Sequence, residues 1–186
     1  MFYYIYRFPL WSVPVIIAAA VILWAAAMII LRRISGGIRA VRIINACLAA
    51  VALGGIFYIT LYHRYSGERE LILMPFSSFA EAKEQREMYR EMLMNVFLFV
   101  PLGLTLPFAL PSRENKRSRS ALLTAAAAAV LSFAVEAAQY FLATGRAETD
   151  DILCNLLGAA LGTAAYIIFA LFTIPRAKAV KTPPGE

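Results

Sequence analysis

The sequence predicts an all-α membrane protein, a polytopic bundle of about five transmembrane helices with an outer re-entrant or interfacial segment between the second and third spans. Hydrophobic residues make up 61% of the 186 residues and charged residues only 16%, with a mean hydropathy of +0.67. Soluble domains are roughly half apolar. Five segments each supply the roughly 20 mostly apolar residues that cross a hydrocarbon core. The net charge of +6 is therefore attributed to membrane topology, and we expect no nucleic-acid partner.

The predicted spans cover residues 9–31, 43–62, 93–111, 121–142 and 152–174. The first has prolines only near its start, where proline is best tolerated, and it lacks the basic leader of a removable signal peptide. We divide the chain into two N-terminal helices in 1–62, an external interfacial loop and helix in 63–92, a three-span domain that with its preceding loop covers 71–174, and a disordered cytoplasmic tail in 175–186.

The distribution of basic residues predicts the orientation of the spans. Eleven of the 18 Lys and Arg residues follow the first, third or fifth span, and the other seven lie on the opposite side. Because cytoplasmic loops carry the excess of Lys and Arg, we expect the N-terminus outside and the C-terminus in the cytoplasm.

The connection between the second and third spans has its own pattern. "LILMPFSSF" is apolar, too short to cross the membrane and interrupted by Pro75, which is typical of a re-entrant or surface-lying segment. "AEAKEQREMYREMLM" mixes acids and bases at helical spacings and predicts a polar helix that leads into the third span.

Polar side chains lie at one depth in three of the predicted spans. Glu136 falls about 9 Å below the outer end of the fourth span at about 1.5 Å per residue, and Gln139 shares its helix face. In the fifth span Asp151 and Asn155 lie on one stripe with Gly158 and Gly162, glycines that permit close helix packing. Asn95 enters the third span near the same level. We therefore expect one polar cluster near the outer surface.

An ionised carboxylate in hydrocarbon needs hydration, a proton or a partner. Arg146 is the nearest cation to Glu136 in sequence, and we expect the two to pair. Asp150, Asp151 and nearby Glu148 then exceed the single guanidinium. The site could hold a proton on Glu136, a divalent cation or a cationic ligand group; a metal ion is not required, and its ligands stay unknown. Alternatively, the cluster only ties three helices together.

Several motifs around these residues resemble the VanZ-like family of bacterial integral membrane proteins. They are "NVFLFVPLG" from Asn95, the ExxQ pair of Glu136 and Gln139, and "GRAETDDILCNLLGAALG" from Gly145, with "PFSSF" before them. The resemblance covers about residues 71–170, and the first two spans match only as generic apolar helices. It implies a bacterial cytoplasmic membrane location and a link to low-level resistance to glycopeptide antibiotics, above all teicoplanin. It implies no reaction.

The favoured hypothesis is a site that binds or modifies an envelope lipid or lipid-linked glycan, with an anionic lipid or a lipid-linked precursor as partner beside the bilayer itself. The expected catalytic residues are Glu136, Asp150 and Asp151, and the expected ligand-binding residues are Arg146, Gln139, Asn155 and Asn95. Whether a reaction is catalysed stays open, because the motifs include no nucleophile or histidine. The alternatives are a membrane scaffold with a structural polar cluster and, less favoured, a small transporter.

Overall fold

The computed structural model describes residues 12–34, 37–62, 69–82, 85–110 and 117–173. Its elements in chain order are α2 (Ser12–Arg32), α3 (Gly37–Phe57), the π-helical turn η1 (Tyr58–Tyr62), β1 (Glu70–Ile72), α4 (Ser77–Glu81), α5 (Arg86–Ala109), α6 (Arg117–Leu142), β2 (Arg146–Glu148) and α7 (Thr149–Thr173). Five helices in these ranges are long and apolar enough to cross a membrane, which confirms the predicted all-α class with five spans. The expected C-terminal tail and the start of the first span lie outside the described residues.

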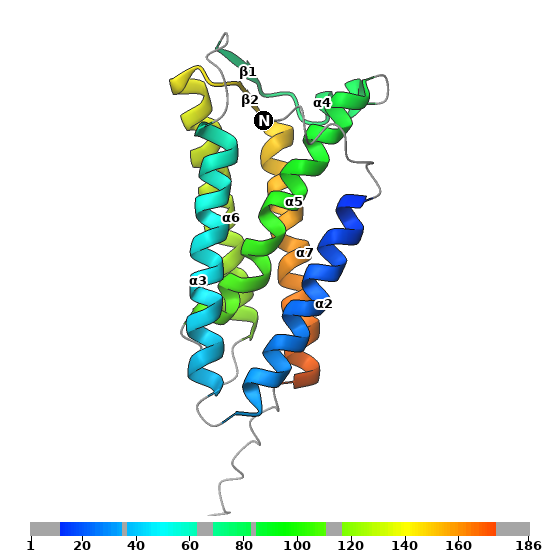
Figure 1. The fold of residues 1–186 in the computed structure, drawn as a ribbon. Helices are drawn as coiled ribbons and strands as arrows, with labels where there is room; N and C mark the ends of the chain where they lie inside the picture. The colour runs from blue at the N-terminus through cyan, green and yellow to red at the C-terminus, as the bar shows by residue number, and fades with distance from the viewer. Residues whose placement is uncertain (1–11, 35–36, 63–68, 83–84, 111–116, 174–186) are drawn as a thin grey trace, which may run out of the picture.

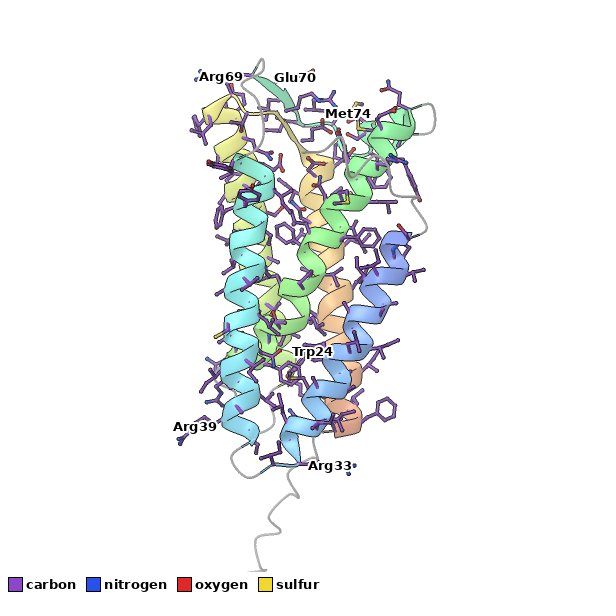
Figure 2. The ribbon with its side chains drawn as sticks, viewed as in Figure 1. Trp24, Arg33, Arg39, Arg69, Glu70 and Met74 are labelled. Atoms are coloured by element: carbon purple, nitrogen blue, oxygen red, sulfur yellow. The ribbon has the colours of Figure 1, made fainter. Side chains whose placement is uncertain are left out.

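The long helices run side by side, and the two short strands and α4 gather at one end of the bundle, which we call the sheet end (Figure 1). Arg33 and Arg39 lie at the opposite end, which we call the basic end, whereas Arg69, Glu70 and Met74 lie at the sheet end (Figure 2). The connection between the second and third spans therefore covers one end of the bundle.

The main core lies between α3, α5, α6 and α7. It consists of the buried side chains of Ile56, Phe99, Leu102, Ala128, Val135 and Ala159. Helix α2 lies at the edge of the bundle (Figure 1) and is attached by Trp24, whose Nε1 donates to the Asn45 side chain of α3 at 3.1 Å. The Trp24 ring also contacts the ring of Phe108 in α5.

Helices α5 and α7 approach each other closely because glycine faces backbone on both helices. A Cβ atom on Gly158 would collide with the Val96 carbonyl of α5. Pro107 lies inside α5 and has no N–H, so the Gly103 carbonyl four residues earlier loses its helical partner. The hydroxyl of Thr163 in α7 donates to that carbonyl at 3.2 Å. Pro107 thus leaves the Gly103 carbonyl available as an acceptor, and the Thr163 hydroxyl of α7 donates to it. Such a bond is needed because a bilayer core contains no water to satisfy a free carbonyl.

Strands β1 and β2 pair in parallel, with Glu70 opposite Arg146, Leu71 opposite Ala147 and Ile72 opposite Glu148. The sequence did not predict this pair. It matters for the site because it aligns the segment before α5 with the short connection between α6 and α7.

Candidate functional site

The polar residues of the sheet end come from four parts of the chain. Helix α6 contributes Glu136 and Gln139, β2 contributes Arg146 and Glu148, the start of α7 contributes Asp150 and Asn155, and α4 contributes Ser78. All of them are buried except Arg146, whose side chain is 38% exposed. The predicted gathering of α6, β2 and α7 residues at one end is therefore seen.

Arg146 is fixed by its own strand. Its Nε lies 2.9 Å from Oε1 of Glu148, whose side chain is 7% exposed, and 4.0 Å from Oε2 of Glu70, which is 55% exposed. Residues two apart in a strand point to the same face, so Arg146 and Glu148 project together. We expected Arg146 to pair with Glu136, and the ion pairs seen join it to Glu148 and Glu70 instead.

Glu148 connects the strand to both α4 and α6. Its Oε2 accepts a hydrogen bond from Oγ of Ser78 at 2.6 Å, while its backbone N–H donates to Oε2 of Glu136 at 3.0 Å. Sequence reasoning counted Glu148 only as an additional carboxylate and gave Ser78 no role. The "PFSSF" stretch and the alternation of Arg146 and Glu148 were the signals that could have identified them.

Asp150 caps α4 from a distant part of the chain. Its Oδ1 accepts from the backbone N–H of Phe76 at 2.6 Å and its Oδ2 from that of Ser78 at 2.8 Å, and Asp150 itself is 1% exposed. A carboxylate on the first N–H groups of a helix satisfies donors that have no helical partner. Phe76 has a φ of 66°, a left-handed conformation that costs free energy for a residue with a side chain. Asp150 therefore positions the loop and α4.

Two buried amides also join the helices. Gln139 donates from Nε2 to the Thr60 carbonyl of η1 at 3.1 Å, and Asn155 donates from Nδ2 to Oγ of Ser132 at 2.9 Å. Within the described ranges, the amide oxygens of Gln139 and Asn155 are buried without a hydrogen-bond partner. Such acceptors cost free energy unless water or a ligand donates to them.

Two further candidates lie at the margin. Asp151, expected on one stripe with Asn155, is only half-buried, and its neighbour Asp150 takes the buried position. Asn95 of α5 is also half-buried. The cluster therefore centres on Glu148 and Asp150, with Asp151 next to Asp150 in the chain.

The carboxylates are not arranged as a metal centre. In the part of the chain that the structure describes, no group of three or more His, Cys, Asp or Glu side chains could hold a metal ion. The oxygens of Glu148 and Asp150 are engaged by Arg146, Ser78 and backbone N–H groups. The divalent-cation hypothesis thus gains no support from this geometry.

The fold and the site define a multi-pass helical membrane protein with a polar, carboxylate-rich network at one end of the bundle. The chain belongs to the VanZ/LLP1 family, whose profile matches residues 44–170. The match begins within α3, so it includes the second span, which the motifs alone had left outside the resemblance. The chain is also 31% identical over 99 residues to Protein VanZ of Enterococcus faecium. That alignment covers 53% of this chain and 53% of that protein, about half of its length. No solved structure matches the chain.

Proposed function

We propose that the sheet end binds the anionic headgroup of an envelope lipid or lipid-linked glycan, with Arg146 as the contact to phosphate or carboxylate. One observation carries this proposal. The loop and α4, held by Glu148 and Asp150, expose large apolar side chains next to the half-exposed guanidinium: Leu73, Met74, Phe76 and Phe79 are 68%, 73%, 65% and 42% exposed. A fixed cation beside exposed hydrocarbon suits an amphipathic ligand.

The contact between Arg146 and Glu148 prepares the guanidinium for such a ligand. Glu148 engages Nε, and an arginine has five N–H donors in a planar fork. The remaining donors suit the paired oxygens of a phosphate or carboxylate. The buried amide oxygens of Gln139 and Asn155, which have no hydrogen-bond partner within the described ranges, would accept hydrogen bonds from hydroxyl or amide groups of a bound glycan.

A further-reaching version of the proposal is that the protein also modifies the lipid that it binds. Glu136 would accept the proton, because a carboxylate that takes the backbone N–H of Glu148 on Oε2 has further lone pairs for a ligand. Asp150 would act by positioning α4, and Asp151 and Asn95 would border the ligand. We further propose that the protein lies in the bacterial cytoplasmic membrane with the sheet end outside, the N-terminus outside and the C-terminus inside, since 11 of the 18 Lys and Arg residues follow the first, third or fifth span in the sequence.

An outward-facing site of this kind would meet envelope precursors outside the cell. We therefore propose that the chain lowers susceptibility to teicoplanin, as the family resemblance implies. The similarity to Protein VanZ supports this link over the matched half of that relative.

The decisive experiment compares Arg146→Ala with Arg69→Ala. Both arginines lie at the sheet end, but Arg69 is exposed and donates to the Phe141 carbonyl at 3.3 Å. Lipids retained by each purified full-length protein are identified by mass spectrometry, and teicoplanin susceptibility is measured in cells with equal membrane abundance. We expect one lipid class and the resistance to be lost with Arg146→Ala alone. Equal lipid profiles in wild type and Arg146→Ala would refute the binding site.

A scaffold function is the second candidate, because much of the network is satisfied within the protein. Glu148 and Asp150 both use their oxygens to hold α4. Glu136→Gln separates the two functions, since glutamine keeps an acceptor for the Glu148 N–H but cannot transfer a proton in the same way. Full activity of Glu136→Gln at normal thermal stability would exclude chemistry at Glu136 and favour a scaffold.

A further inference from the structure

The basic end carries an open pocket of about 600 Å³ between the end of α2 and the start of α3. Its lining consists of Arg32, Ile34, Gly37, Ile38, Arg39 and Arg42. Three of these six residues are arginines and none is acidic. The volume lies within the range of about 300 to 1,000 Å³ typical of small-ligand sites. This pocket lies at the opposite end of the bundle from the network around Arg146 (Figure 2).

Arg32 is held in place at the wall of this pocket. Its Nη1 lies 3.4 Å from both the carbonyl and the Oγ1 of Thr173, and its guanidinium carbon lies 5.6 Å from the ring centres of Phe108 and Phe169. Its Nε is buried and has no hydrogen-bond partner within the described ranges. A buried donor on a cation costs free energy unless an acceptor, best an anionic one, reaches it.

The start of α3 adds donors to the same wall. Gly37 is the first residue of this 21-residue helix, and its N–H donates to the Ile34 carbonyl at 2.9 Å. The next N–H groups of a first helical turn have no helical acceptor and form the positive end of the helix dipole. Together with three guanidinium groups, they favour a group with several anionic oxygens.

The rim of the pocket is apolar and exposed. Ile34 is 58% exposed and Ile38 is 78% exposed. Ile34 follows α2 and Ile38 lies in the first turn of α3, and both helices are long and apolar enough to cross a membrane. An anion in this pocket would therefore lie beside hydrocarbon, as the phosphate of a phospholipid does. Basic pockets between transmembrane helices bind such headgroups in other membrane proteins.

We propose that this pocket binds the phosphate headgroup of an anionic phospholipid, with Arg32, Arg39 and Arg42 on the phosphate and Ile34 and Ile38 along the glycerol and acyl chains. The site is independent of the one proposed at the sheet end. It would anchor the start of α3 and the end of α2 to the leaflet on that side of the membrane.

The test uses two double variants of the full chain that remove the same charge from the basic end. Arg39→Gln with Arg42→Gln removes two of the three arginines that line the pocket, and both side chains are exposed. Arg33→Gln with Arg119→Gln removes two exposed arginines that do not line the pocket. Purified proteins are titrated with phosphatidylglycerol or phosphatidylcholine and read by native mass spectrometry.

We expect the pocket pair to bind phosphatidylglycerol at least about tenfold more weakly, since each arginine at an anionic headgroup contributes about 1 kcal/mol and 1.4 kcal/mol is tenfold. The control pair should stay near wild type, and phosphatidylcholine should bind weakly to all. Equal losses of phosphatidylglycerol binding in the two double variants would show that the lipid is held by general charge attraction, and this would overturn the proposed site. Displacement of the lipid by inorganic phosphate alone would overturn the lipid assignment. If the pocket pair fails to fold, Arg39→Gln against Arg33→Gln makes the same comparison.

Discussion

The attachment of α4 to α7 by Asp150 makes a quantitative prediction for Asp150→Ala. The carboxylate accepts two backbone N–H groups, those of Phe76 at 2.6 Å and Ser78 at 2.8 Å. Alanine would leave both donors without their acceptor. Because Ser78 is 3% exposed, water cannot replace that bond without local opening, whereas Phe76 is 65% exposed and can be rehydrated. The variant should therefore release the loop and α4 from the bundle.

The size of the effect follows from these exposures. A hydrogen bond to a charged acceptor contributes about 1.5 to 3 kcal/mol, and a rehydrated one contributes less. One full bond and part of a second give about 2 to 4 kcal/mol, which is about 30- to 1,000-fold in the equilibrium for local opening. The left-handed backbone of Phe76 favours opening as well, since the strain is relieved when the loop is released.

Cys154 provides the assay. It is buried in α7, one turn after Asp150, and packs against Met88, Met92 and Val96 with Ala82 beside them. Cys47 is exposed, so a Cys47→Ser background leaves Cys154 as the thiol to be labelled. When opening is faster than labelling, the maleimide rate follows the open population. Asp150→Ala should raise that rate about 30- to 1,000-fold.

A matched control comes from the same turn. Oγ of Ser77 donates to the Met74 carbonyl at 2.8 Å in an exposed position, so Ser77→Ala should change the rate by less than about threefold. Asp150→Asn should fall between the two because its amide oxygen can still accept one bond. If Asp150→Ala and Ser77→Ala label Cys154 at the same rate, Asp150 does not hold α4 in place.

Three further predictions concern the bundle. Gly158→Ala should lower the free energy of unfolding by about 1 to 3 kcal/mol because the new methyl group meets the Val96 carbonyl. Gly54→Ala should not lower it, because a Cβ atom at Gly54 has no atom within 4 Å. Equal melting temperatures of the two variants in detergent would contradict this prediction. Asn45→Ala removes the acceptor of Trp24 Nε1 and should shift Trp24 emission to the blue in a Trp11→Phe background, because an indole N–H without an acceptor emits at shorter wavelength. An unchanged spectrum would be inconsistent with the contact between α2 and α3. In a double-mutant cycle, the effects of Glu148→Gln and Arg146→Gln on the unfolding free energy should be non-additive by about 1 kcal/mol. The coupling energy is small because Arg146 is partly exposed. Strictly additive effects would argue against the ion pair.

The spans could be predicted because membrane crossing depends on the length of an apolar run, which is local information. Their ends were less accurate. The predicted third span begins at residue 93, whereas α5 begins at Arg86, because the polar helix predicted before that span is continuous with it. The pairing of β1 with β2 could not be predicted, since each strand has three residues and their contact joins distant parts of the chain.

Much of the site could be predicted from helix geometry. A rise of about 1.5 Å per residue places Glu136, Gln139 and Asn155 at similar depths, and the structure brings them to the same end. The choice of partners could not be predicted. Arg146 meets Glu148 because both lie on one face of a strand, and Asp150 is buried because it faces the loop before α4. Both contacts depend on loop structure that helical periodicity does not describe.

The polar site and the close helix packing both depend on the first half of α7. Asp150 and Asn155 hold α4 and α6 near the start of the helix, and Gly158 and Gly162 press its next turns against the α5 backbone. A shift of α7 away from α5 would therefore also move Asp150 away from the loop that it caps. This coupling separates indirect from direct loss of function. Gly158→Ala should reduce lipid binding at the sheet end together with faster labelling of Cys154, whereas Arg146→Ala should abolish lipid binding at the sheet end while Cys154 stays protected.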